Sequence, residues 1–367
     1  MIIGVNLLSL RIDGGGTRHF AESLLLELAE PPFSRRHLLL LFCLPDMSGH
    51  LETLFDGRSN VSVMPICSEK DISRCADMMD VYFCPLNAYY PVLNSRPSVA
   101  CLMDIQEHFF PQYFSKEQME LRAKLYPSVV HDSTIACTIS DFCGRSFVEK
   151  LGADRDTVRV VRLYPQKRLL EASSEAPDDC PEDFMLYPAN WYAHKNVKNL
   201  VNGYLRARRQ RSGLPELVLV GHPMSDGRAW LDELALTDPE AKYVRLYTEI
   251  HVAGLRGLYE RARFIVLPTL FEGYCMPLAE AIIFGRPVLA NDLPVMREIG
   301  GKWPVYEKLG SVAEISDAIL FMCQQRGVPK DELPPALANW SWTKIAWEYD
   351  SIFNEALTRH RIANLIS

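Results

Sequence analysis

Two acidic residues, Glu272 and Glu280, stand eight residues apart in the segment FEGYCMPLAEA at positions 271–281. The apolar run just upstream, at 264–268, contains β-branched residues and predicts a short buried strand. Pro277 favours the first position of a helix, where its missing N–H is not needed. We therefore expect a strand, then an exposed turn that carries Glu272, then a helix that carries Glu280 one turn inside.

The start of that helix is suited to a particular kind of ligand. Unpaired N–H groups and partial positive charge at a helix N-terminus attract phosphate, whereas neighbouring carboxylates are suited to hydroxyl groups. Gly285 is placed to end the helix before a second apolar strand at 287–290. The segment thus indicates a pocket for a molecule that is both phosphorylated and rich in hydroxyl groups.

A lysine is expected on the same sheet edge. The strand predicted at 184–188 runs into the sequence ANWYAHKN at 189–196. Lys195 would stand at the carboxyl end of this strand and open a helix at 197–208, where it could neutralise a diphosphate as a point charge. An isolated lysine is more often a solvated surface residue, but the shared edge with Glu272 favours the binding role.

Three consecutive glycines, Gly14 to Gly16, follow the first expected strand and precede a helical pattern. Such a turn lets the backbone approach a ligand closely, and Thr17 is placed to cap the helix. The spacing differs from the GxGxxG dinucleotide fingerprint and from the Walker loop. A flexible surface turn is the alternative interpretation of this segment.

The segment CLMDIQEHFFP at 101–111 leaves another buried strand and enters a loop. Asp104 stands at the strand end and His108 lies beyond it, so both are candidates for contact with an acceptor hydroxyl. A helix-capping aspartate and a packed histidine are the alternative. The sequence contains no GxSxG nucleophile motif.

Length and composition narrow the class of protein. The 367 residues suit two domains with separate cores, and the net charge of -7 argues against a nucleic-acid binder. No apolar run reaches the roughly 18 residues needed to span a bilayer, and the N-terminus lacks the basic region of a signal peptide. The ten cysteines show no zinc-ligand spacing, so we expect reduced thiols, no metal site and a cytoplasmic location.

Short apolar strands alternate with helical stretches, which is typical of parallel α/β sheets. The polar, proline-bearing stretch at 166–182 is interpreted as a linker between domains at 1–165 and 183–341. Residues 342–367 are expected to form a helix that can pack back on the first domain. Two doubly wound domains follow, with ligands in a cleft at the carboxyl ends of the strands. The expected strands are 2–7, 38–43, 61–64, 81–84, 98–102, 134–139, 158–163, 184–188, 217–220, 243–246, 264–267 and 288–290.

Together these motifs resemble the retaining glycosyltransferases of family 4, whose GT-B fold has two facing Rossmann-like domains. The strongest element is the pair Glu272 and Glu280 with seven residues between them, followed by GRPV at 285–288. Supporting elements are the glycine turn at 14–16, the loop at 104–111, residues 138–140 and YPANWYAHKN at 187–196, which is similar to a subgroup from bacterial surface-polysaccharide assembly.

The resemblance assigns roles in the binding of a nucleotide-sugar donor. It implies that Glu280 binds the ribose hydroxyls, that Lys195 binds the diphosphate, and that Glu272 lies near the donor sugar. Glu272, Lys195 and Asp104 are thereby the candidate catalytic residues. The other residues implied are Gly15, Gly16, Asn190, Ile250 (against the nucleobase), Gly273, Tyr274, Cys275 and Met276 for the donor, and Met103, Asp104 and His108 on the acceptor side.

The chain departs from the family pattern at three places. Ala189 and Asn190 occupy the region where the family pairs its lysine with an arginine. Either the diphosphate is neutralised more weakly, or Arg11, Arg18 or another cation supplies the charge. Met103 replaces a common histidine, which leaves a backbone carbonyl for the acceptor. Cys275 replaces a usual glycine and adds bulk next to the expected sugar pocket.

The resemblance implies a metal-independent hexosyltransferase that retains the anomeric configuration, with mannose and a guanosine nucleotide slightly favoured. No cofactor is implied beyond the GDP- or UDP-sugar co-substrate. The acceptor would be a glycan or a lipid-linked oligosaccharide, which leaves peripheral association with the inner face of the cytoplasmic membrane open. The alternative is a GT-B scaffold that acts as a sugar epimerase or as a catalytically silent assembly partner. The glycine spacing disfavours a nicotinamide oxidoreductase.

Overall fold

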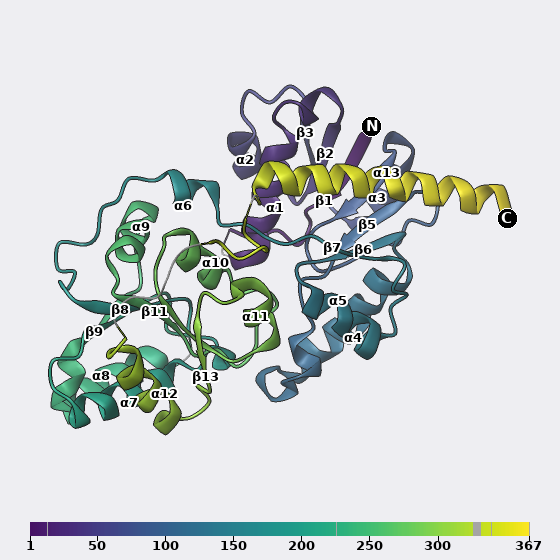
Figure 1. Ribbon diagram of the computed structural model, residues 1–367. Coiled ribbons are helices and arrows are strands. Elements are labelled where there is room, and N and C mark those ends of the chain that lie inside the picture. Colours follow the sequence, from purple (N-terminus) through teal and green to yellow (C-terminus); the bar gives the residue numbers. More distant parts are fainter. Residues whose placement is uncertain (13, 225, 326–331, 339, 367) are drawn as a thin grey trace. The chain divides into compact units, whose positions relative to one another are not determined.

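The computed structural model describes residues 1–12, 14–224, 226–325, 332–338 and 340–366 (Figure 1). The chain divides into two compact units. The first unit comprises Met1–Leu163 and Trp340–Ser367, and the second comprises Tyr164–Asn339. Each unit is built around its own parallel sheet, as the alternation of strands and helices predicts.

The first sheet has seven parallel strands in the order β3-β2-β1-β4-β5-β6-β7. All seven strands expected from the first half of the sequence are present. The strand order reverses between β1 and β4, which lie side by side at the centre of the sheet. The strands are β1 Ile2–Asn6, β2 Leu38–Cys43, β3 Val61–Pro65, β4 Val81–Cys84, β5 Ser98–Cys101, β6 Ile135–Thr138 and β7 Val158–Val160.

The second sheet has six parallel strands in the order β10-β9-β8-β11-β12-β13, and its order reverses between β8 and β11. Strand β13 is not among the expected strands, because its residues VYE lie between Pro304 and Lys308 and form neither an apolar run nor an alternation. The strands are β8 Phe184–Pro188, β9 Glu216–Val220, β10 Val244–Tyr247, β11 Phe264–Leu267, β12 Val288–Asn291 and β13 Val305–Glu307.

Helices cover both sheets, as the crossover between parallel strands requires. The helices of the first unit are α1 Gly15–Leu28, α2 Pro45–Leu54, α3 Glu69–Arg74, α4 Lys116–His131, α5 Asp141–Leu151 and α13 Trp342–Ile366. Those of the second unit are α6 Lys167–Glu171, α7 Val197–Gln210, α8 Gly227–Thr237, α9 Val252–Arg261, α10 Met276–Ile283, α11 Pro294–Gly300 and α12 Val312–Met322. Short 3₁₀ helices are η1 Phe33–Arg35, η2 Ala76–Met78, η3 Gln106–His108, η4 Pro111–Tyr113, η5 Ala193–Lys195 and η6 Pro239–Tyr243.

Helix α13 belongs to the first unit although it is the last element of the chain (Figure 1). Its Tyr349 and Phe353 are fully buried and pack against the ring of Phe83 on β4, at centroid distances of 5.5 and 5.2 Å. Asp350 accepts a hydrogen bond from buried His37 at 2.7 Å. The helix therefore supplies part of the core of the first unit.

The segment at 166–182, interpreted from sequence as a linker, lies within the second unit and contains α6. The guanidinium of Arg256 on α9 donates to the carbonyl oxygens of Leu170 and Ala172. A side chain at Gly257 would collide with the backbone of Ala176, so the segment passes directly over the helix. These contacts attach the segment to α9.

Two local predictions at helix starts are wrong. Helix α1 begins at Gly15 with Gly14 as the preceding residue, and no side chain caps it, so Thr17 is not the cap. Pro277 is the second rather than the first residue of α10, because Met276 already has helical conformation.

Candidate active site

The loops that follow β8 and β11 bring together the two residues on which the sequence hypothesis mainly rests. These strands are neighbours at the point where the strand order of the second sheet reverses. Ligands of open parallel sheets bind at such switch points, outside the carboxyl ends of the strands. Lys195 lies in the loop after β8 and Glu272 in the loop after β11, so both stand at the expected edge.

Lys195 and Glu272 form an ion pair in which Nζ lies 2.6 Å from Oε1. The two side chains are only 16% and 10% exposed, so solvent screens the pair weakly. The ammonium and the carboxylate neutralise each other, and both side chains keep a small solvent-exposed area. A diphosphate that approached Lys195 would share this cation with the carboxylate.

The two loops are tied to each other by hydrogen bonds that the sequence does not reveal. The carbonyl oxygen of His194 accepts from the backbone N–H of Leu270 at 2.7 Å and from the hydroxyl of Thr269 at 3.3 Å. The side-chain amide of Asn291 donates to the carbonyl of Thr269 at 2.8 Å. Burial first, and then the neighbouring Lys195, lower the pKa of His194 to about 4, so its imidazole is neutral near pH 7.

The turn between the two acids has a residue in the left-handed region of backbone conformation. Cys275 adopts φ +69° and immediately precedes α10. Gly273 and Tyr274 are buried beside it, whereas Met276, the first residue of α10, is half-buried. The Cys275 thiol is 4% exposed, and its pKa is raised by burial and then by the charge of Glu272. It is therefore a neutral thiol, close to the carboxylates on either side.

Glu280 lies in the middle of α10 and is 8% exposed. Its burial raises the pKa of the carboxyl group to about 7. The hydroxyl of Tyr259, on α9, donates a hydrogen bond to Oε2 of Glu280 at 2.6 Å. Sequence reasoning missed Tyr259, because 21 residues separate it from Glu280 and no motif includes it.

Two further residues that are predicted to bind the donor lie at the same edge of the second sheet. Ile250 follows β10 and is half-buried, and its side chain packs against Gly254 in the first turn of α9. Asn190 follows β8, and its Oδ1 accepts from the backbone N–H of His222 at 2.7 Å. Asn190 thus joins the loops after β8 and β9.

In the first unit, the glycine turn follows β1, and Gly15 and Gly16 are exposed. The two arginines considered as replacements for the missing cation are engaged within this unit. Nε of Arg18 lies 2.6 Å from Oε1 of Glu22, which also contacts His50 at 2.8 Å. Arg11 donates to the carbonyl oxygens of Leu10 and Leu8, at 2.7 and 3.1 Å. Arg18 also donates to the carbonyl oxygen of Ile12, so both guanidinium groups hold the turn itself.

The residues predicted on the acceptor side follow β5 of the first sheet. The backbone N–H of Met103 donates to Oδ1 of Asn87 at 2.9 Å, and its carbonyl oxygen accepts from Thr138 at 3.1 Å. Oδ1 of Asp104 accepts from the backbone N–H of Gln106 at 3.1 Å, and His108 is exposed. The residue that precedes η3 is Ile105, with no side-chain cap, so Asp104 is not the helix cap of the alternative interpretation, and the exposed His108 is not packed.

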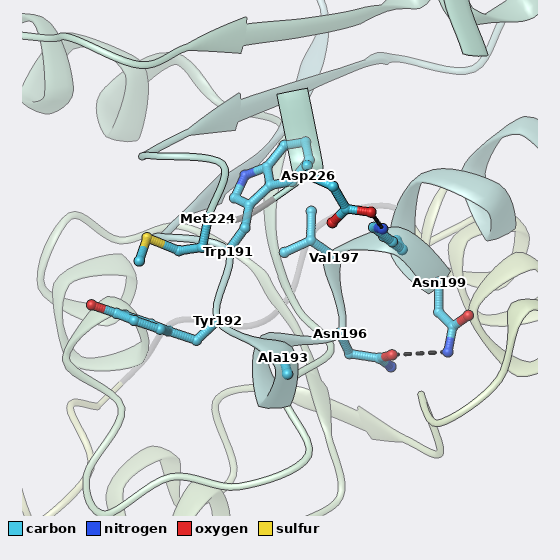
Figure 2. A pocket seen from close by; sticks show the side chains of 10 residues that line it. Trp191, Tyr192, Ala193, Asn196, Val197, Asn199, Met224 and Asp226 are labelled. Carbon is cyan, nitrogen blue, oxygen red and sulfur yellow. Dashed lines mark hydrogen bonds and ion pairs between the residues drawn. The ribbon is translucent and has the colours of Figure 1, made fainter. Parts of the chain in front are cut away.

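A pocket of about 350 Å³ lies beside the β8 loop, between the start of α7 and the residues before α8. In Figure 2, Trp191 and Tyr192 line it together with Met224. Lys195, Glu272 and Glu280 are not among its lining residues. The pocket is thus separate from the side chains of the candidate site. The remaining lining residues are Ala193, Asn196, Val197, Lys198, Asn199, Asp226 and Gly227.

Part of the chain is similar to known proteins. Residues 183–325 match the family model described as glycosyl transferases group 1. The chain is 24% identical to the O-antigen chain mannosyltransferase B of Escherichia coli over 259 residues, which cover 66% of this chain and 65% of that protein. It is 23% identical to the O-antigen chain mannosyltransferase RfbU of Salmonella typhimurium, covering 59% of this chain and 57% of that protein. The chain thus spans about two thirds or less of the length of these curated relatives.

Solved structures share the fold over nearly the whole chain. A glycosyltransferase from Rickettsia africae ESF-5 has a TM-score of 0.68 at 13% identity and covers 97% of this chain and 98% of its own. Anabaena Alr3699/HepE, in complex with UDP and glucose, has a TM-score of 0.62 at 16% identity and covers 100% and 99%. The protein has the GT-B fold, which confirms the predicted fold class.

None of the helices in the described part of the chain is long and apolar enough to cross a membrane.

Proposed function

We propose that the protein is a glycosyltransferase that moves a hexose from a nucleoside-diphosphate sugar to a hydroxyl group of a glycan or lipid-linked acceptor, with retention of configuration and without a metal ion. The observation that carries this proposal is the site at the switch point of the second sheet. There Lys195, Glu272 and the start of α10 meet, within the segment that matches the glycosyl transferases group 1 model.

The chemical demands of a diphosphate leaving group suit this site. The backbone N–H groups of the first turn of α10 carry partial positive charge, and Lys195 adds a full charge next to Glu272. Fixed donors and charges of this kind stabilise a developing negative charge without reorganisation. Glu280, one turn further along the helix, offers a carboxylate to the hydroxyl groups of a ribose.

The choice of sugar and acceptor rests on the names of the relatives. The three curated proteins are named as mannosyltransferases, and two of them as O-antigen chain enzymes. A mannose donor and a polysaccharide acceptor are therefore the first choice, and the relatives do not favour the epimerase or silent-partner alternative. If the acceptor is lipid-linked, the enzyme works from the cytoplasm at the inner face of the membrane.

The proposed reaction exchanges one bond at the anomeric carbon for another on the same face. The bond between this carbon and the diphosphate oxygen breaks, and the acceptor oxygen forms the new bond. The acceptor's proton passes to the departing phosphate oxygen, and Lys195 together with the helix start stabilises the diphosphate. Glu272 lies beside Lys195, where it can bind hydroxyl groups of the transferred sugar.

Single substitutions in the site test this function by release of nucleoside diphosphate from GDP-mannose and UDP-glucose in the presence of polysaccharide acceptor. Lys195→Ala is expected to lower turnover about 100-fold or more, because a charge on the leaving group loses its partner. Glu280→Ala is expected to raise KM for the donor at least about tenfold, the value of a hydrogen bond to a charged group. Excess EDTA is expected to leave the rate unchanged.

The matched control is Lys198→Ala, on the first turn of α7, because Lys198 is exposed and pairs with Asp226 rather than with Glu272. This variant is expected to turn over normally. Full activity in both Lys195→Ala and Glu280→Ala would overturn the assignment of the site.

A further inference from the structure

In the described part of the chain, Glu280 is held by one side chain, which the sequence motif does not contain. Tyr259 is fully buried on α9, and its hydroxyl lies 2.6 Å from Oε2 of Glu280. Its ring stacks on that of Phe284 at a centroid distance of 5.3 Å and an interplanar angle of 26°. Packing therefore fixes where the hydroxyl points, and the hydroxyl in turn fixes the carboxylate.

The direction of this hydrogen bond follows from the surroundings of the two groups. Burial and the nearby charge of Glu280 raise the pKa of Tyr259 well above its ordinary value, so the phenol keeps its proton and donates. Oε2 therefore accepts. Among the described residues, Oε1 of Glu280 receives no hydrogen bond. A carboxylate with one oxygen held and the other available can accept from a ligand in a defined geometry.

On this basis, and resting on the proposed function, we propose that Tyr259 is a positioning residue for the donor: its hydroxyl holds Oε2 of Glu280 so that Oε1 accepts hydrogen bonds from the ribose hydroxyls. The hydroxyl need not touch the donor to do this. Its contribution is to orient the acceptor and to favour its ionised form, because a donated hydrogen bond stabilises a carboxylate.

The ionisation of Glu280 gives the proposal a measurable signature. Burial raises the pKa of Glu280 to about 7, and the Tyr259 hydrogen bond opposes that rise. As the pH falls through 7 the carboxyl gains a proton and accepts less well, so donor affinity falls. Loss of the hydroxyl raises the pKa of Glu280 further and moves the affinity midpoint to higher pH.

Other groups around the carboxyl do not reproduce this effect. The pKa of Cys275, at the start of α10, is raised by burial and then by neighbouring carboxylates that include Glu280, so its thiol stays neutral over this range. On α9, Arg256 pairs with Glu260 at 2.8 Å and lies over the ring of Phe284. A pH midpoint near neutrality therefore reports Glu280.

The experiment measures affinity of the full chain for GDP-mannose and UDP-glucose by calorimetry between pH 6 and 9, without acceptor. A nucleoside-diphosphate sugar is the suitable probe, because it lacks the terminal phosphate whose own proton would titrate in this range. For Tyr259→Phe we expect the midpoint to rise by about one pH unit and the affinity at pH 7 to fall roughly fivefold, because the ionised fraction of Glu280 at pH 7 drops from about one half to about one tenth. Near pH 9, where Glu280 is ionised in both, Tyr259→Phe and the unaltered protein are expected to have the same donor affinity.

A control variant and a control donor test whether the shift of the midpoint comes from the Tyr259 hydroxyl and the ribose. Tyr306→Phe removes a half-buried hydroxyl of the second unit that donates to the carbonyl oxygens of Met296 and Gly301 rather than to Glu280, so its midpoint is expected to match that of the unaltered protein. A donor with 2′,3′-dideoxyribose cannot donate to Oε1, and its affinity is expected to be insensitive to Tyr259→Phe. A uniform loss of affinity in Tyr259→Phe with an unmoved midpoint would mean a purely structural role and would overturn the proposal.

Glu280→Gln keeps the proposal testable if Tyr259→Phe does not fold. This variant cannot titrate, so the pH dependence of donor affinity is expected to vanish; its persistence would overturn the proposal. The failure of the proposed function looks different. In that case neither donor binds the unaltered protein at any pH, or Glu280→Gln binds both donors as the unaltered protein does.

Discussion

At the scale of single residues, Cys275 has a strained backbone conformation within the candidate site. A residue other than glycine in the left-handed region is strained by about 1 kcal/mol or more, and Cys275 holds φ +69° in the turn between the two acids. The resemblance places a glycine here. The thiol is nevertheless buried, so the position combines backbone strain with side-chain packing.

Comparison of Cys275→Gly with Cys275→Ala separates strain from packing, since both variants lose the thiol. We expect the glycine variant to have the higher free energy of unfolding, by about 1 kcal/mol, because only glycine adopts the left-handed region without strain. Urea denaturation measures the difference. At Cys143, buried inside α5, the order is expected to reverse, since glycine weakens a helix. An alanine variant more stable than the glycine variant at Cys275 would exclude strain there.

At the scale of elements, the last helix is held on the first unit by a buried polar contact as well as by aromatic packing. Nε2 of His37 lies 2.7 Å from Oδ1 of Asp350, and the two side chains are 1% and 6% exposed. Burial, as the largest cause, lowers the pKa of His37, so a neutral imidazole donates to the carboxylate near pH 7. Arg36 contacts the other oxygen of Asp350 at 3.0 Å.

Asp350→Ala is expected to lower the free energy of unfolding of the first unit by about 2–3 kcal/mol, because buried His37 is left without its partner. Denaturant unfolding followed by circular dichroism measures the loss. The control is Glu355→Ala on the same helix. Its ion pair with Arg159 is about one-third exposed on both sides, so a loss of less than about 1 kcal/mol is expected. Equal losses in the two variants would contradict the role given to burial.

At the scale of the whole molecule, each unit has a core of its own, and the candidate donor residues are divided unequally between them. Lys195, Glu272 and Glu280 all belong to the second unit. A nucleoside diphosphate at one hundred times its dissociation constant stabilises a folded protein by about 2.7 kcal/mol. This stabilisation is expected to concentrate where the ligand binds.

Hydrogen exchange of the full chain with and without GDP or UDP locates that stabilisation. Backbone amides at 193–196 and 273–280 are expected to exchange more slowly with ligand, while β2 and β3, on the outer edge of the first sheet, remain unchanged. Lys195→Ala is expected to abolish the protection at the same ligand concentration. Protection absent from the second unit would contradict a nucleotide site at its switch point.

The sequence by itself determined the alternation of strands and helices, the two parallel sheets and the turn with its two acids. Those features follow from local periodicity, glycine and proline, which act over a few residues. Within the described part of the chain the sequence missed β13, whose residues VYE form neither an apolar run nor an alternation.

Only the tertiary structure decided which groups touch. It paired Lys195 with Glu272 across 77 residues and Glu280 with Tyr259 across 21, and it assigned the last helix to the first unit. It also showed that Arg11 and Arg18 donate to carbonyl oxygens of their own turn. Such contacts depend on strand order and on the packing of helices over a sheet. These place residues together that are distant in sequence, so no local pattern encodes them.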